Sequence, residues 1–234
     1  MQYVMFVRVD PDLAGPTDVD VVPWIEEGAR SGMRTGGGPV EDPDTATTVR
    51  VRDGSAAIED GQAVATGEVV AGYDLLEADD IDDVVAYAAK HPMAEFGALE
   101  VREVWDDFIE ETPSPKPEPT PEGADFLFVH VPEPELLATA TRETGDPTSW
   151  VRETEKRHVN LGGFRLRDDA EASTVIRKRD GEVLVTRGPF AELAEQIAGI
   201  DRLRVADLDE AIALAITHPT ARFGAIEIRP MRRA

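Results

Sequence analysis

Apolar and polar residues alternate along this chain in patterns that occur once in each half. A run of apolar and aromatic residues predicts a strand near the start of each half, at 2–9 and at 125–131. Further along, apolar residues occur every three or four positions, which predicts a helix with one buried stripe. The stripe consists of Ile81, Val84, Val85 and Ala88 in the first half and of Leu208, Ala211, Ile212, Ala215 and Ile216 in the second.

Shorter elements complete the same order in both halves. A helix is predicted around 21–31 and around 148–157. Strands follow at TTVRVRDG and STVIRKRDG, whose Asp-Gly pairs favour a hairpin turn because they tolerate positive φ angles. A His-Pro pair ends each second helix, since proline disfavours helical geometry in the residue before it, and a last strand follows. The predicted order is β-α-β-β-α-β in each half, a ferredoxin-like unit of the α+β class.

The two halves are copies of one unit. HPMAEFGALEVREV, from His91, and HPTARFGAIEIRPM, from His218, are nearly the same sequence. Between the halves, a segment with proline at alternate positions forbids a helix and favours an extended polyproline path. We therefore expect a first repeat at 1–109, a linker at 110–123 and a second repeat at 124–234.

Composition excludes several classes of function. The 234-residue chain has a formal net charge of −23, which repels the phosphate backbones of nucleic acids, so no direct binding to DNA or RNA is expected. Without cysteine it has no thiolate catalysis, disulfide or cysteine-bound zinc. No apolar run is long enough to cross a bilayer and no signal-peptide pattern is present, so we expect a soluble cytoplasmic protein without a membrane segment.

His130 is the histidine with the clearest potential for chemistry. It ends the first strand of the second half, where the first half has Arg8, and it shares a strand face with Phe126 and Phe128. If that face lines a cleft between the sheets, His130 and Arg8 approach the cleft as a base and a fixed cation. The alternative is a solvent-facing polar residue at a strand end.

Acidic and basic residues alternate along the two last strands. Glu100 with Arg102, and Glu227 with Arg229, each project from one face of a strand. Such a pair can bind a carboxylate or phosphate group. The alternative is a salt-bridge ladder, which contributes only tenths of a kcal/mol for each pair.

The remaining histidines and two tryptophans are predicted to be structural. His91 and His218 end helices, where a cationic imidazole favours the negative terminus or a ring nitrogen bonds a terminal carbonyl. His158 is likewise predicted to end a helix. Trp24 and Trp150 occupy matching helix starts and are predicted to pack in the core.

Metal and cofactor motifs are absent from the sequence. No second histidine or carboxylate lies at helical ligand spacing around His91 or His218. The glycines at 36–38 lack the lysine of a phosphate loop and are predicted to form a turn or a bulge. G-x-S-x-G and H-E-x-x-H do not occur either, so neither a cofactor nor a metal is expected.

Several segments together resemble the YCII-related, or DGPF, domain family. They are WIEE and WVRE at the first helices, TATTVRVRDG, GPFAELAEQIAG, ADLDEAI and HP-x-A-x-FG-x-(L/I)-E-(V/I)-R. The resemblance covers nearly all of both halves except the linker. It implies that two ferredoxin-like units pair their sheets as a dimeric α/β-barrel, here within one monomeric chain. Some members are encoded beside, or fused to, extracytoplasmic-function sigma factors, and some relatives are similar to small lyases proposed to use a His–Asp pair.

The loop that carries the family's acid differs between the copies. The second half keeps most of the loop but has Arg187 in place of the acid, whereas the first half keeps Asp60 and loses the residues after Gly61. Each copy has lost what the other kept. The resemblance therefore implies one asymmetric site built from complementary parts.

Three functions are expected from these residues. The first is a module that binds a small anionic ligand or a protein partner in a cleft between the repeats. Its ligand-binding residues are Arg8, Arg102, Arg187 and Arg229. The second is a lyase or isomerase with His130 as catalytic base and Asp60 as orienting acid. The third, suggested by the resemblance alone, is an accessory regulator of a sigma factor.

Overall fold

The computed structural model describes residues 1–10, 19–63, 68–105, 122–168, 172–188 and 197–232. Nearly all of the predicted linker at 110–123 lies outside these ranges. The described residues form two compact units, each with one six-stranded antiparallel sheet and a few helices. This α+β arrangement is compatible with two ferredoxin-like repeats.

Unit 1 is built mainly from the first repeat. Its sheet has the strand order β10-β9-β6-β1-β5-β2. The elements from the first repeat are β1 (Gln2–Val9), α1 (Val22–Ser31), β2 (Arg34–Pro39), β5 (Val69–Glu77), α2 (Ile81–Ala88), the 3-10 helix η2 (Pro92–Glu95) and β6 (Gly97–Glu103). The elements from the second repeat are the hairpin strands β9 (Ser173–Arg179) and β10 (Glu182–Arg187).

Unit 2 is built mainly from the second repeat and has the matching strand order β4-β3-β12-β7-β11-β8. From the first repeat come the 3-10 helix η1 (Pro43–Thr45) and the hairpin strands β3 (Thr47–Arg52) and β4 (Ser55–Asp60). From the second repeat come β7 (Ala124–Pro132), α3 (Pro134–Leu137), α4 (Arg142–Gly145), α5 (Thr148–Lys156), β8 (Asn160–Arg165), β11 (Gly199–Val205), α6 (Leu208–Thr217), α7 (Thr220–Phe223) and β12 (Gly224–Pro230).

The repeats exchange their hairpins. Strand β9 pairs with β6 in unit 1, and β3 pairs with β12 in unit 2. The predicted Asp-Gly turns are confirmed, because both residues of each turn have positive φ angles: 52° and 78° at Asp53 and Gly54, and 52° and 82° at Asp180 and Gly181. The hairpins themselves were predicted, but their exchange between repeats was not.

The exchange changes which segments form the ferredoxin-like strands. We expected TTVRVRDG to be the second strand of the first repeat and the glycines at 36–38 to be a turn or a bulge. Those glycines lie in β2, which is the second strand, and a register shift of the β-bulge type between Arg34 and Gly36 agrees with the predicted bulge. Gly37 has a φ of 127°, and a Cβ there would lie 2.4 Å from the Tyr73 carbonyl oxygen, so this strand requires glycine to approach β5 closely.

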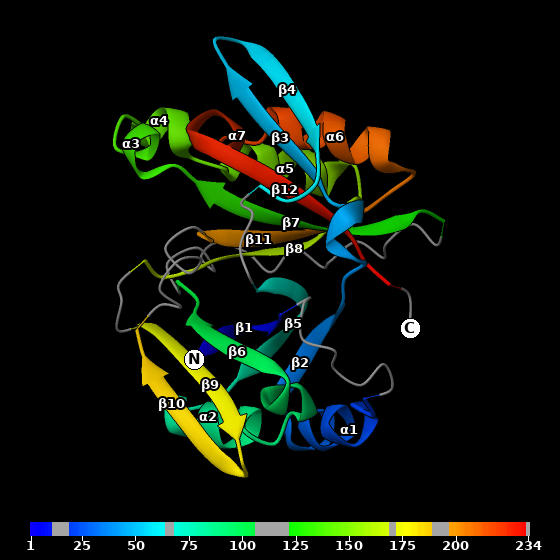
Figure 1. Ribbon diagram of the computed structural model, residues 1–234. Coiled ribbons are helices and arrows are strands. Elements are labelled where there is room, and N and C mark those ends of the chain that lie inside the picture. The colour runs from blue at the N-terminus through cyan, green and yellow to red at the C-terminus, as the bar shows by residue number, and fades with distance from the viewer. Residues whose placement is uncertain (11–18, 64–67, 106–121, 169–171, 189–196, 233–234) are drawn as a thin grey trace. The chain divides into compact units, whose positions relative to one another are not determined.

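Helices cover one face of each sheet (Figure 1). In unit 1, α1 and α2 pack against Met5 and Leu99, and in unit 2, α5 and α6 pack against Phe128 and Ile226. Both matching tryptophans are buried, as predicted. The indole N–H of Trp24 donates to the Tyr87 carbonyl at 3.1 Å, and that of Trp150 donates to the Leu214 carbonyl at 3.0 Å. Each tryptophan therefore joins the first helix of its repeat to the second.

Helix length also bears on membrane topology. Among the described residues, no helix has the length and apolar character required to cross a bilayer.

Replacing Ile176 tests whether β9 is packed into a core. Ile176 belongs to the second repeat, yet it is fully buried in the core of unit 1 with Leu99 and Val101. We expect Ile176→Ala to lower the free energy of unfolding by about 2–4 kcal/mol, as measured by urea denaturation. The matched control is Leu184→Ala in the same hairpin, where the side chain is 49% exposed and a change below about 0.5 kcal/mol is expected. Equal effects of the two substitutions would contradict the burial of Ile176 in a core.

Candidate functional site

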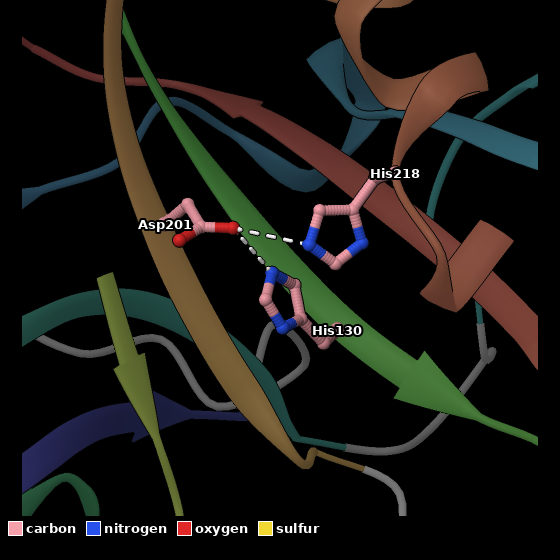
Figure 2. Close-up of side chains that lie close together, drawn as sticks. All are labelled: His130, Asp201 and His218. Carbon is pink, nitrogen blue, oxygen red and sulfur yellow. Dashed lines mark hydrogen bonds and ion pairs between the residues drawn. The ribbon is translucent and has the colours of Figure 1, made fainter. Parts of the chain in front are cut away.

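Two histidines and an aspartate meet on the helix-covered side of the unit 2 sheet. His130 Nε2 lies 2.8 Å from Asp201 Oδ2, and His218 Nε2 lies 3.5 Å from the same oxygen. The two imidazole rings are 4.5 Å apart between their centroids. Figure 2 shows the carboxylate of Asp201, on β11, pointing toward both rings, with His130 on β7 and His218 just after α6. Residues distant in sequence thus form one compact cluster.

Strand register places His130 in this cluster and corrects its predicted counterpart. His130 lies opposite Ile226, and Val7 lies opposite Leu99, the residue that matches Ile226 in the first repeat. The position equivalent to His130 is therefore Val7 and not Arg8. Since neighbouring residues of a strand point to opposite faces, this one-residue difference changes the face.

The expected approach of His130 and Arg8 to one cleft is accordingly wrong. His130 does share a face with Phe126 and Phe128, as predicted, but that face packs against the helices of unit 2. In unit 1 the helix-covered face carries Val7, so Arg8 projects from the opposite face of its own sheet.

His218 ends α6, as predicted, and its backbone N–H donates to the Ala215 carbonyl at 3.1 Å. Its ring acts at the next helix instead, because Nδ1 accepts the amide N–H of Thr220, at the start of α7, at 3.1 Å. His91 makes the same bond with the amide of Met93, at 3.1 Å. A nitrogen that accepts a hydrogen bond carries no proton, and the neutral ring of His218 therefore has its N–H on Nε2, which faces Asp201.

Burial fixes the charge of two members of the cluster. Burial lowers the pKa of His218 to about 3, and the neighbouring His130 adds to this effect while Asp201 opposes it. Burial also acts to raise the pKa of Asp201, but the charge and hydrogen bond of His130, together with His218, outweigh it and the pKa falls below its usual range. At neutral pH the site therefore contains an ionised Asp201 and a neutral His218.

His130 is the member that reaches solvent. Its side chain is 14% exposed, whereas that of Asp201 is 7% exposed. Since Asp201 is ionised, Nε2–H of His130 donates to it, and in the neutral form of the ring Nδ1 is then an acceptor. The sheet thus presents a nitrogen lone pair on an imidazole that is oriented by a buried carboxylate.

Two glycines make room for these side chains. A Cβ at position 163 would lie 1.9 Å from Asp201 Oδ1, and a Cβ at position 199 would lie 2.9 Å from His130 Nδ1. Both distances are shorter than a real contact, so Gly163 on β8 and Gly199 on β11 are needed for the observed positions of Asp201 and His130.

Unit 1 contains an altered copy of the cluster. Asp74 and His91 match Asp201 and His218 in the repeat, but Asp74 binds Arg34 Nε at 2.7 Å. Burial raises the pKa of Asp74, and Arg34 opposes this effect. Burial and the charge of Arg34 lower the pKa of His91 to about 4. With valine at position 7 and a guanidinium beside the carboxylate, this copy has no imidazole equivalent to His130.

The arginines predicted to bind a ligand hold carboxylates of the protein. Arg8 Nε donates to Glu100 at 2.7 Å, and Arg102 lies 3.6 Å from the same carboxylate. Arg229 lies 3.2 Å from Glu227. These contacts are the salt-bridge ladder described above as the alternative, although the residues are buried and not exposed.

The two residues predicted from the family loop lie elsewhere. Asp60 is exposed at the end of β4, and the carboxylate bound to His130 is Asp201. Arg187 is exposed at the end of β10 and lies 3.2 Å from Asp82. The orienting acid therefore differs from the one predicted.

Asp201 was missed because His130 lies 71 residues away in the sequence and His218 follows a different element, α6. A signal was present: in each repeat one aspartate lies between a glycine and a leucine at alternate positions of a strand, in AGYDLLE and in GIDRLRV. A charged residue at a buried strand position requires a partner, and the repetition of this pattern marks the site. His158, by contrast, ends a helix as predicted, with a φ of 57° where the first repeat has Gly32.

The three ligand-type atoms of His130, Asp201 and His218 lie within 4.8 Å of one another, as in sites where two histidines and one carboxylate hold a divalent metal. The hydrogen bond to His218 opposes this use. A metal on Nε2 requires the ring proton on Nδ1, but Nδ1 accepts the amide N–H of Thr220. The arrangement fits proton transfer better than metal binding.

Comparison with known proteins identifies the repeats. The YCII-related domain matches residues 1–108 and again residues 127–234. The chain is also similar to an uncharacterised protein of Rhizobium meliloti (strain 1021), with 37% identity over 62 residues, which are 26% of this chain and 50% of that protein. The chain thus spans about half the length of this relative.

The low pKa values of the capping histidines predict acid sensitivity. An unfolded histidine titrates near pH 6.5, whereas His218 titrates near 3 and His91 near 4 in the folded chain. As the pH falls below about 6.5, the unfolded state binds these protons first, so stability present at neutral pH is lost by about 1.4 kcal/mol per pH unit for each histidine.

Substituting His218 removes one of the two histidines that cause this acid sensitivity. Asparagine can cap α7 without titrating, so His218→Asn should make the slope of unfolding free energy against pH shallower by about one proton between pH 6 and 4. Urea unfolding across that range measures the slope. An unchanged slope would show that His218 is charged or exposed in the folded chain.

Proposed function

Since the chain belongs to the YCII-related domain family and contains the domain twice, we propose that its second repeat is an acid–base site of the lyase or isomerase type, while the first repeat completes the structure. The observation that carries the proposal is the 2.8 Å contact between His130 and the buried carboxylate of Asp201. A site of this kind removes a proton from a small molecule and returns it.

His130 acts as the base in this proposal. Its neutral ring donates Nε2–H to Asp201 and takes the substrate proton on Nδ1. The imidazolium that forms lies beside an ionised carboxylate, which stabilises its charge. The neutral ring of His218 lies near the same carboxylate oxygen, with its Nε2 at 3.5 Å.

The first repeat cannot perform the same step. Its matching aspartate, Asp74, binds Arg34, and a guanidinium does not release a proton at physiological pH. Val7 occupies the position of the base. We therefore propose that the duplicated family domain keeps one active copy and one structural copy.

Binding without catalysis is the second candidate. A neutral imidazole with a free acceptor nitrogen also recognises a donor group of a ligand, and the altered first repeat favours a protein in which activity has been reduced. The buried arginines are weaker candidates for binding an anionic ligand, because Arg8, Arg102 and Arg229 each contact a carboxylate of the chain. Regulation of a sigma factor stays a proposal that rests on the family resemblance.

Pairing of the two sheets as a dimeric α/β-barrel belongs to the same proposal. The exchange of hairpins supports it, since each sheet depends on strands of both repeats. Small-angle X-ray scattering distinguishes one compact particle from two tethered units and would contradict the barrel if it showed the latter.

Proton exchange tests the catalytic proposal. In D₂O, the wild-type chain should speed deuterium incorporation at the acidic carbon of at least one member of a panel of small keto acids and hydroxy acids, followed by NMR. His130→Ala should reduce the rate by about 10²–10⁴-fold, because a positioned general base contributes that much. Asp201→Asn should cause a large loss as well, since an amide does not stabilise the imidazolium.

The control substitution is His158→Ala, because His158 is exposed in the same repeat. It should leave the exchange rate unchanged. If a panel member raises the melting temperature in a His130-dependent manner but exchanges no deuterium, the site binds without catalysis. If His130→Ala exchanges as fast as the wild type, the proposed base is wrong.

A further inference from the structure

The hairpin that the first repeat contributes to unit 2 ends beside α7, the short helix that follows His218. Arg52 is the last residue of β3, next to the Asp-Gly turn. Its Nη1 donates to the carbonyl of Ala221 at 3.0 Å and to that of Arg222 at 3.4 Å, and its Nη2 donates to the carbonyl of Gly224 at 3.2 Å. One guanidinium thus binds three carbonyls around the end of α7.

These carbonyls need a donor. The last turn of a helix leaves its carbonyls without partners inside the helix, and a cation at that end is favourable. Arg52 is itself held by Glu133, whose Oε1 accepts from Nη2 at 2.7 Å. The clamp formed by Arg52 therefore fixes the position of α7, a helix of a single turn.

The start of α7 holds the ring of His218. The amide of Thr220 donates to His218 Nδ1 at 3.1 Å, and the amide of Ala221 donates to the His218 carbonyl, also at 3.1 Å. The hydrogen bond to Nδ1 determines which nitrogen of His218 carries the proton, and that N–H faces Asp201. A continuous set of contacts runs from Arg52 through α7 and His218 to the carboxylate that orients His130.

We propose that Arg52, a residue of the first repeat, is a positioning residue for the His130–Asp201 site of the second repeat and acts through α7 and His218. The inference rests on the acid–base function proposed above. It gives the duplication a role in the chemistry: the structural copy supplies the hairpin that sets the proton position on His218.

Unit 1 provides a matched control within the same chain. Arg179, at the end of β9, donates to the carbonyls of Ala94, Glu95 and Gly97 at 3.0, 3.2 and 3.1 Å. The 3-10 helix η2 follows His91, and the amide N–H of Met93 in η2 donates to His91 Nδ1, as the amide of Thr220 in α7 donates to His218. The cluster near this second clamp has no imidazole equivalent to His130. Removing Arg179 should therefore destabilise the fold, as removing Arg52 does, without slowing proton exchange.

The experiment compares Arg52→Gln with Arg179→Gln in the full chain. Both substitutions should lower the melting temperature by similar amounts, because both remove a guanidinium from three carbonyls. Only Arg52→Gln should raise the pKa of His218 from about 3 toward 6.5, as water reaches the loosened ring, and only it should slow proton exchange, by at least tenfold. NMR titration of the imidazole signals and the deuterium assay measure these effects. Arg52→Lys, which keeps the charge but loses the forked geometry, should give an intermediate result and serves if the glutamine variant does not fold.

The outcomes separate the two proposals. If Arg52→Gln leaves the His218 signals and the exchange rate as they are in Arg179→Gln, Arg52 is only a structural clamp and the inference is wrong. If Arg52→Gln shifts the His218 titration while His130→Ala leaves exchange unchanged, the clamp positions His218 but the catalytic function fails. A response of both His218 and the exchange rate to Arg52→Gln alone supports the inference.

Discussion

The antiparallel pairing of the last strand of each repeat with a hairpin strand of the other repeat is the interaction on which the rest of the structure depends. Strands β6 and β12 would otherwise expose a row of backbone N–H and C=O groups along one edge, and β9 and β3 satisfy them. The exchanged strands also fill the cores, with Ile176 in unit 1 and Val49 in unit 2. Neither repeat completes a six-stranded sheet from its own residues. Joining the copies in one chain keeps the partner strand at a high effective concentration.

A fused pair also permits the two copies to differ. In a pair of identical chains, a substitution at the aspartate cluster changes both sites, whereas here Asp74 binds Arg34 and Asp201 binds His130. Arg34 and His130, the partners of the two aspartates, differ in whether they can release a proton. A guanidinium remains protonated and neutralises the carboxylate permanently, while an imidazole gains and loses a proton near neutral pH. The copy with arginine resembles a structural ion pair, and the copy with histidine resembles an acid–base pair.

The elements set by local chemistry could be predicted from the sequence. The Asp-Gly turns, the helix ends at His-Pro and the buried tryptophans all depend on neighbouring residues. The exchange of hairpins could not be predicted, because Val49 and Ile176 occupy matching positions in similar strands, and either hairpin would satisfy either edge. His130 was identified as a candidate, but its counterpart was misplaced by one residue, an error that moves a side chain to the other face of a sheet. Its acid was missed because strand pairing, and not sequence spacing, brings Asp201 to His130.

The neutral state of His218 is the last element that the site requires. The ring lies 4.5 Å from that of His130, between centroids. If it were cationic, it would compete for the carboxylate of Asp201 and repel a proton on His130. Burial and the amide of Thr220 both oppose that charge, since one penalises the cation and the other occupies Nδ1 with a donor. The neutral ring of His218 therefore leaves the negative charge of Asp201 to its hydrogen bond with His130. A histidine whose position in the sequence suggests only a helix end thus stays neutral beside the carboxylate that binds His130.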